Sequence, residues 1–245
     1  MEKNYIYGIR AVIEAIDSGK SIDKVLVRRD LSGDLSRELM AKIKEYGTVM
    51  QKVPVDKLNR ITVKNHQGVI AILSPVSYQK LENLVPLFYE EGRNPLILVL
   101  DGITDTRNFG AIGRTADCAG IDAIVIPERN SVSVTPDAMK TSAGALLYVP
   151  VCRERSTLDA VKFLKANGYR IVGATEKGAE DYTKADYTVP VAIVMGNEET
   201  GISNEVLRQC DDLAAIPIYG NIGSLNVSVA AGVMLYEAVR QRRNL

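Results

Sequence analysis

IPIYGNIGSLNVS, at residues 216–228, is the stretch that decides how the fold is interpreted. It joins an apolar segment with the character of a strand, Leu213–Ile218, to an apolar segment with the character of a helix, Asn226–Val239. A turn that only links a strand to a helix can be much shorter. Glycines here let the backbone approach a ligand closely, and Ser224 and Asn226 offer hydrogen bonds at a helix start. Taken alone, the stretch also fits an ordinary helix cap.

Upstream of this stretch, short apolar runs alternate with segments of helical spacing from Pro95 onward. Fully apolar strands that alternate with helices are typical of a parallel sheet covered on both faces. The pattern therefore predicts an α/β fold for residues 95–245. The expected strands are Leu96–Leu100, Ala123–Ile126, Leu146–Val151, Tyr169–Ala174, Val191–Met195 and Leu213–Ile218, and the expected helices before the last one are Phe109–Ala119, Pro136–Ala143, Thr157–Asn167 and Asn204–Cys210.

The first part of the chain has the pattern of a separate small α/β unit over residues 1–77. Apolar spacing predicts helices over Gly8–Asp17 and Leu35–Tyr46, and strands over Lys24–Arg28 and Val69–Leu73. Residues 78–94 contain a proline and end in a polar, glycine-containing cluster, which is typical of a connecting helix and linker. We therefore expect three parts: residues 1–77, a linker over 78–94, and a larger domain over 95–245.

Composition narrows the class of protein. Apolar residues make up 46% and charged residues 24% of the chain, as is usual for a globular protein with a sizeable core. The three cysteines have no metal-site spacing, which makes a disulfide framework or a zinc site unlikely and fits a reducing compartment. A single histidine, His66, excludes a histidine-rich metal site. No apolar run is long enough to cross a membrane, and we expect a cytoplasmic protein without a metal.

Charge is distributed unevenly along the chain. The net charge is zero, but residues 1–77 carry 13 Lys and Arg against 9 Asp and Glu, and the rest carries 17 against 21. This asymmetry favours a basic module attached to an acidic one, and a basic module suits a nucleic-acid partner.

Two more loops have the same character as the stretch at residues 216–228, and each follows an apolar run. The first, DGITDTRNFG at residues 101–110, leads into a helix that carries Arg114, where an anion such as a phosphate is favoured. The second, GNEETG at residues 196–201, places two carboxylates between two glycines. Neither loop has the glycine spacing of a dinucleotide fold or a P-loop. Because ligands bind beyond the carboxyl ends of parallel strands, these loops predict a shared site.

In this order, the three loops resemble the motifs of the SpoU branch of the SPOUT methyltransferases. Asn108 and Arg114 match the family's Asn-x5-Arg motif, the loop at residues 196–201 matches Gly-x-Glu-x-x-Gly, and residues 216–228 match Ile-Pro followed by Ser-Leu-Asn-Val-Ser. The segments YGIRAVIEA at residues 7–15 and HQGV at residues 66–69 resemble the RNA-binding module of the family's ribosomal RNA guanosine 2′-O-methyltransferases. Many relatives have His where this chain has Arg10.

The resemblance implies a parallel sheet with a C-terminal trefoil knot, S-adenosylmethionine as cofactor, a homodimer, and RNA as substrate. It also implies that backbone groups of Gly196, Ile216 and Leu225 bind the cofactor. In the family, the arginine that matches Arg114 is often assigned as the base. Because an arginine stays protonated in proteins, we expect Arg114 instead to clamp a phosphate and stabilise the developing alkoxide. Glu198 or a water would take the proton of the 2′-hydroxyl, and the residues that would position ribose, phosphate and Arg114 are Asn108, Ser224 and Asn226.

Two alternatives remain at this point. The substrate could be transfer RNA, because only the resemblance of the N-terminal module favours ribosomal RNA. The chain could also be a non-catalytic RNA-binding assembly factor with the same fold. The intact loops and Arg114 argue against the second alternative, since a catalytically dead relative would tend to lose them.

Overall fold

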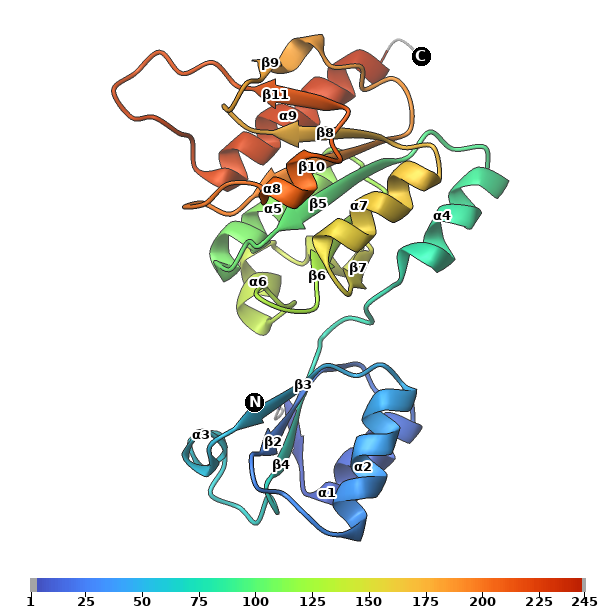
Figure 1. Cartoon of the computed structure of the whole chain (residues 1–245), viewed down its shortest axis with the longest axis vertical. Coiled ribbons are helices and arrows are strands. Elements are labelled where there is room, and N and C mark those ends of the chain that lie inside the picture. Colours follow the sequence, from blue (N-terminus) through green and yellow to red (C-terminus); the bar gives the residue numbers. More distant parts are fainter. Residues whose placement is uncertain (1–3, 244–245) are drawn as a thin grey trace. The chain divides into compact units, whose positions relative to one another are not determined.

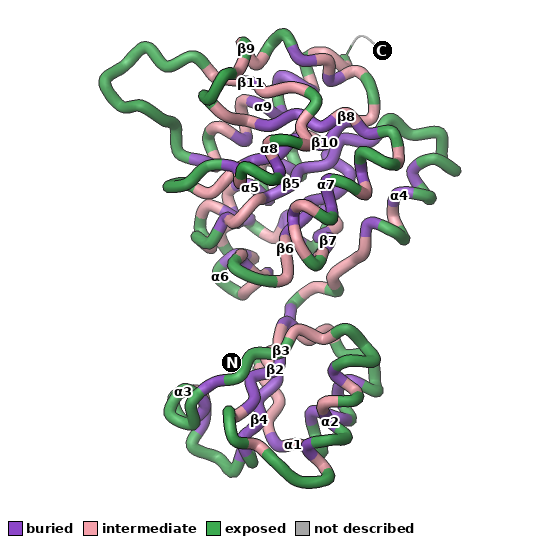
Figure 2. The backbone as a smooth tube through the Cα atoms, viewed as in Figure 1, coloured by how far each residue is buried: buried purple, intermediate pink, exposed green. Residues whose placement is uncertain are grey.

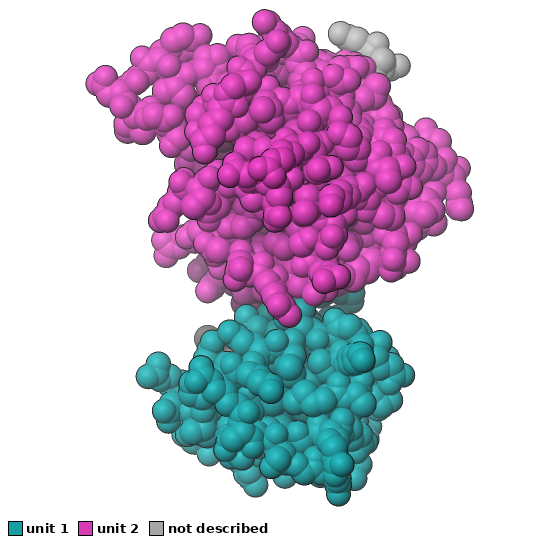
Figure 3. Space-filling view, viewed as in Figure 1, with its two compact units in different colours: residues 1–77 teal, residues 78–245 magenta. Residues whose placement is uncertain are grey.

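The computed structural model describes residues 4–243. They form two compact units that divide after residue 77 (Figure 3). Each unit has its own sheet. No helix among the described residues is long and apolar enough to span a bilayer.

The first unit is a four-stranded sheet in the order β1-β4-β2-β3. The outer strand β3 (Met50–Val53) runs parallel to β2 (Ile22–Arg28), and β4 (Val69–Leu73) is antiparallel to both β2 and β1 (Tyr5–Tyr7). Helices α1 (Ile9–Asp17) and α2 (Asp34–Glu45) pack on one face of the sheet, and the short α3 (Val55–Asn59) contributes Leu58 to the other. The expected α/β unit is therefore present.

Three short elements of this unit were not expected from the sequence: β1, β3 and α3. Each has five residues or fewer, and β1 and β3 are the edge strands of the sheet. An edge strand is partly exposed, so it lacks the continuous apolar run that marked the central strand β4.

The second unit contains a seven-stranded, entirely parallel sheet in the order β7-β6-β5-β10-β8-β11-β9. The predicted parallel α/β fold is confirmed. The strands are β5 (Leu96–Asp101), β6 (Ala123–Pro127), β7 (Val151–Glu154), β8 (Arg170–Ala174), β9 (Glu180–Asp181), β10 (Val191–Gly196) and β11 (Asp212–Ala215).

Helices cover both faces of this sheet (Figure 1). One face carries α4 (Leu81–Glu90), α7 (Thr157–Ala166) and α8 (Asn204–Leu207), and the other carries α5 (Thr106–Cys118), α6 (Pro136–Thr141) and α9 (Val227–Arg242). Alternate residues of β5 serve the two layers: Ile97 and Val99 join the cluster under α4 and α7, and Leu98 and Leu100 point the opposite way. All four are fully buried, which explains why the central strands are continuously apolar (Figure 2).

The stretch expected as a linker, residues 78–94, contains α4. Leu81, Val85 and Phe88 of this helix are buried in the same cluster as Ile97 and Val99. Pro86 lies within α4, yet the helix continues to Glu90. The expected linker is therefore part of the second unit's core.

Two predicted strands need correction. The run Leu146–Val151 is not one strand: residues Ala145–Leu147 form a 3-10 turn, and β7 begins only at Val151. Leu146 is apolar because it packs against Gly113 of α5, where an added Cβ would lie 2.7 Å from a Leu146 methyl carbon. The expected strand Leu213–Ile218 ends at Ala215, so Ile216-Pro217-Ile218 belongs to the connection that follows.

Candidate functional site

The three loops predicted to share a site leave the same edge of the sheet. Strands β5 and β10 are neighbours, with Asp101 in register with Gly196 at their carboxyl ends. The loops that follow them therefore begin side by side. The third loop follows β11, which is separated from β10 by β8.

The first loop is fixed by a helix cap. The Asp105 side chain accepts a hydrogen bond from the backbone N–H of Asn108 at 2.7 Å, which places Asn108 in the first turn of α5. Phe109, next in sequence, is fully buried and anchors this turn in the core. The Asn108 side chain is thereby directed from a rigid helix start.

The second loop, residues 196–201, is closed by Asn197, which sequence reasoning did not single out. Its backbone exchanges hydrogen bonds with Gly201, and its Oδ1 accepts from the amides of Glu199 and Thr200 at 2.9 and 3.2 Å. Its Nδ2 donates to the Gly102 carbonyl at 2.8 Å, which ties the second loop to the first. A Cβ on Gly196 would lie 2.2 Å from the Gly201 backbone, so this tight return requires glycine.

A side-chain network joins all three loops. Asn108 Nδ2 donates to Glu198 Oε1 at 2.9 Å, and Asn226 Nδ2 donates to Asn108 Oδ1 at 3.1 Å. Asn226 also caps α9, because its Oδ1 accepts from the amide and hydroxyl of Ser228. The structure thus brings together three of the five residues predicted to be catalytic. Two of them, Asn108 and Asn226, are 118 residues apart in the sequence.

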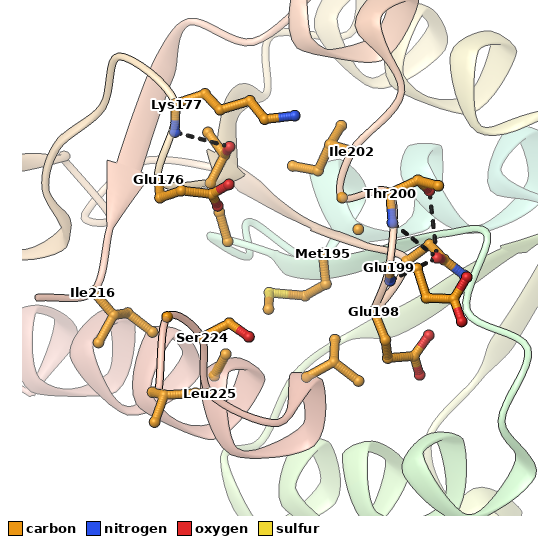
Figure 4. Close-up of a pocket in the computed structure, with 18 of the residues that line it drawn as sticks. Glu176, Lys177, Met195, Glu198, Glu199, Thr200, Ile202, Ile216, Ser224 and Leu225 are labelled. Atoms are coloured by element: carbon orange, nitrogen blue, oxygen red, sulfur yellow. Dashed lines mark hydrogen bonds between the residues drawn. The ribbon is translucent and has the colours of Figure 1, made fainter. Parts of the chain in front are cut away.

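A cavity of about 340 Å³ opens beside this network, between the second and third loops and the loop that follows β8 (Figure 4). The three residues predicted to bind the cofactor, Gly196, Ile216 and Leu225, all line it, as do Ser224 and Glu198. Its other lining residues are Ala174, Thr175, Glu176, Lys177, Met195, Asn197, Glu199, Thr200, Gly201, Ile202, Ala214, Ile218, Gly223, Val227 and Ala230.

The cavity is polarised. Ile216 and Leu225 line one side, Lys177 of the loop after β8 lies across from them, and Glu198 and Glu199 of the loop after β10 line a third side (Figure 4). The loop after β8, with Glu176 and Lys177, was not identified from the sequence. It could have been found by the same rule as the others, since it too follows a buried parallel strand. A cavity of this size with an apolar part and a polar part suits a small organic ligand.

Arg114 is not brought to the cavity. It is exposed on α5 and makes no hydrogen bond or ion pair with any residue between 4 and 243. Over the same residues, no three His, Cys, Asp or Glu side chains cluster in a way that could hold a metal.

His66, the only histidine, has a structural environment in the first unit. It is 8% exposed, its Nε2 lies 2.9 Å from Asn59 Oδ1, and its Nδ1 accepts from the Gly68 amide at 3.0 Å. These contacts shape the loop between α3 and β4.

Comparison with known families covers both units. The SpoU rRNA Methylase family matches residues 95–236, and a family described as RNA 2′-O ribose methyltransferase substrate binding matches residues 5–79.

Full-length relatives agree with these matches. A Staphylococcus saprophyticus protein that carries the name of the TrmH family of tRNA/rRNA methyltransferases is 37% identical over 242 residues, which are 99% of this chain and 97% of that protein. Among solved structures, an AdoMet-bound rRNA methyltransferase from Sinorhizobium meliloti has a TM-score of 0.63 and 29% identity over 96% of this chain and 86% of its own. The SpoU methyltransferase AviRb from Streptomyces viridochromogenes, in complex with AdoMet, has a TM-score of 0.61 and 29% identity over 98% and 91%.

Proposed function

The chain belongs to the SpoU rRNA methylase family of RNA methyltransferases, and from that premise we propose that it transfers a methyl group from S-adenosylmethionine to a ribose 2′-hydroxyl of ribosomal RNA. The observation that carries the proposal is the meeting of three loops, through Glu198, Asn108 and Asn226, beside a cavity that Glu198 lines. The target nucleoside we propose is a guanosine, on the resemblance of the N-terminal module alone.

The residues present fit this cofactor. The apolar part of the cavity, with Ile216 and Leu225, suits an adenosine, and the charged part suits an amino-acid end. Two structural neighbours contain AdoMet. When bound, S-adenosylmethionine supplies an electrophilic methyl group. We propose that backbone groups at Gly196, Ile216 and Leu225 hold the adenine.

The protein's own side chains supply positioning and proton transfer in this proposal. Glu198 keeps one carboxylate oxygen on Asn108 and has the other free to accept the 2′-hydroxyl proton, directly or through a water. Asn108, Ser224 and Asn226 orient the ribose and its phosphate. Arg114 clamps the phosphate and stabilises the alkoxide as it develops.

Ribosomal RNA is the substrate we favour over transfer RNA. The match of residues 5–79 to a substrate-binding family and the positive balance of residues 1–77 support an RNA-reading module. The Sinorhizobium meliloti neighbour is an rRNA methyltransferase, whereas the staphylococcal relatives carry a name that covers both substrates. Transfer RNA remains the second candidate, and such an enzyme would act in the cytoplasm in either case.

We also propose a homodimer and a trefoil knot. Apolar side chains are exposed along α9 and the connection before it: Val229 and Tyr236 are 52% and 51% exposed, and Tyr219 and Ile222 are 96% and 79% exposed. A second protomer would cover such a surface. The knot would involve the loops at residues 196–203 and 216–226, which Asn108 links through its hydrogen bonds with Glu198 and Asn226.

The test is a methyl-transfer assay on the full chain, combined with calorimetry. We expect one S-adenosylhomocysteine site per chain without added metal, and transfer of labelled methyl groups to ribosomal RNA in preference to transfer RNA. Digestion of the product should locate the label on the ribose. Absence of S-adenosylhomocysteine binding, or label on a base, would contradict the proposal.

A further inference from the structure

We propose that Lys177 binds the carboxylate of the amino-acid end of S-adenosylmethionine. The inference rests on the proposed function, because it assumes that the cavity binds this cofactor. It concerns a residue outside the three motif loops, in the connection that follows β8.

Local geometry directs the Lys177 side chain toward the cavity. The Thr175 hydroxyl accepts a hydrogen bond from the Lys177 backbone N–H at 3.2 Å, which turns the chain just after β8 ends at Ala174. Figure 4 shows the side chain extended toward Ile202, which directly follows the loop at residues 196–201. Lys177 lines this cavity and also the adjoining one of about 550 Å³, so it lies where the two meet.

The charged residues that line the cavity indicate which group of the ligand Lys177 binds. The charged residues that line the first cavity are Glu176, Glu198 and Glu199, together with Lys177. A ligand carboxylate is repelled by the three glutamates and attracted by the one cation among these lining residues. The ligand's ammonium and sulfonium groups, in contrast, are favoured by the surrounding carboxylates.

The glycine loop, residues 196–201, offers few free backbone donors for a carboxylate. The amides of Asn197, Glu199, Thr200 and Gly201 all donate within the glycine loop, and the Ser203 amide donates to Asp101. The Thr200 hydroxyl also lies 3.3 Å from Asn197 Oδ1. Because these donors are occupied, the loop cannot act as the anion-binding nest that glycine-rich loops often form.

The apolar part of the cavity sets the ligand's direction. Ile216 and Leu225 lie on the opposite side of the cavity from Lys177 in Figure 4. An adenosine placed against Ile216 and Leu225 directs the amino-acid end of the same ligand toward Lys177. One lysine thus fixes which way the cofactor lies.

The experiment compares two ligands by calorimetry on the full-length chain. S-adenosylhomocysteine has the amino-acid end, and 5′-methylthioadenosine lacks it. For Lys177→Met we expect about a 10-fold loss of affinity for S-adenosylhomocysteine, as for one charge-assisted hydrogen bond at a partly exposed site. Affinity for 5′-methylthioadenosine should stay within about twofold, the scatter expected when no contact is lost. Lys177→Arg should recover most of the loss.

Lys184→Met is the matched control. Lys184 lies seven residues further along, is exposed, and among the described residues forms one ion pair, with Glu180 at 3.8 Å, so its loss should leave both affinities unchanged. Unchanged S-adenosylhomocysteine affinity in Lys177→Met, or an equal loss for both ligands, would overturn the inference. Failure of the unaltered chain to bind S-adenosylhomocysteine would instead overturn the proposed function.

Discussion

Arg114 and Asn108 are six positions apart on α5, yet the structure gives them different surroundings. Asn108 is held by Asp105, Glu198 and Asn226, whereas Arg114 is exposed. A residue fixed by three partners is suited to orient other groups, and an exposed guanidinium is suited to meet a large anionic substrate. The separation supports the division of labour proposed above, in which α5 supplies both positioning and phosphate binding.

Arg114→Ala should abolish methyl transfer and leave cofactor affinity nearly unchanged, because Arg114 does not line the cavity. Arg114→Lys should restore little activity, since a bidentate guanidinium becomes a point charge. Single-turnover transfer and S-adenosylhomocysteine calorimetry on the same preparations measure the two effects. A near-normal single-turnover rate for the alanine variant would remove Arg114 from the mechanism.

Individual site residues were predictable from the sequence where a motif marked them. The residues that line the cavity as expected, Gly196, Ile216 and Leu225, stand in such motifs. Asn197 and Lys177 were not predicted, because their roles depend on contacts with Gly102 and with a cavity formed by three loops and α9. That Arg114 lies away from the cavity was also not predicted, since a helix start says nothing about which side chain faces the cavity.

At the scale of elements, the glycine loop after β10 shows why a connection can be more constrained than a strand. Apolar residues within β10 accept conservative apolar changes in principle, whereas Gly196, where the strand ends and the loop begins, faces backbone atoms that cannot move aside. The apolar runs of the central strands were sufficient to predict a parallel sheet. They did not distinguish the strand β7 from the turn at Ala145–Leu147, because packing against α5 also requires an apolar side chain.

Gly196→Ala should destabilise the second unit by about 2–3 kcal/mol and reduce cofactor binding, because the new methyl group would overlap the Gly201 backbone. Gly220→Ala is the control: no atom lies within 4 Å of a Cβ there, so stability should be unchanged or slightly higher. Urea unfolding followed by circular dichroism reports both. Equal stability of the two variants would contradict the loop geometry.

Cysteine reactivity provides a second check, on how far the helices and strands bury the thiol groups. Burial raises the pKa of the Cys152 thiol on β7 to about 12 and that of Cys210 to about 11, whereas Cys118 is exposed at the end of α5. A raised pKa leaves almost no thiolate at pH 8, and the thiolate is the reactive form. A thiol-reactive disulfide reagent at pH 8 should therefore titrate one cysteine quickly in the native chain and all three in urea. Two or more fast thiols in the native chain would show that Cys152 on β7 and Cys210, after α8, are not shielded as described.

At the scale of the whole molecule, the two units divide charge and chemistry between them. The cavity and the motif loops belong to residues 78–245, and the excess of basic residues belongs to residues 1–77. The position of the boundary between the units decides which fragment should be used to study the second unit alone. A fragment that starts at residue 95 loses the buried Leu81, Val85 and Phe88, so residues 78–245 are the appropriate fragment.

Deletion of residues 1–77 should leave a folded fragment that still binds S-adenosylhomocysteine but loses most activity on its natural RNA. The expected contacts include Arg10, Lys24, Arg28, Arg29 and Lys64 of the deleted unit. Each phosphate that a basic residue neutralises adds about 0.7–0.9 to the slope of log affinity against log salt, so the full chain should lose RNA affinity more steeply than the fragment as salt rises. RNA affinity of both proteins at several salt concentrations provides the comparison. Equal affinities with equal slopes would mean that the N-terminal unit does not read the substrate, and that recognition lies in the catalytic unit itself.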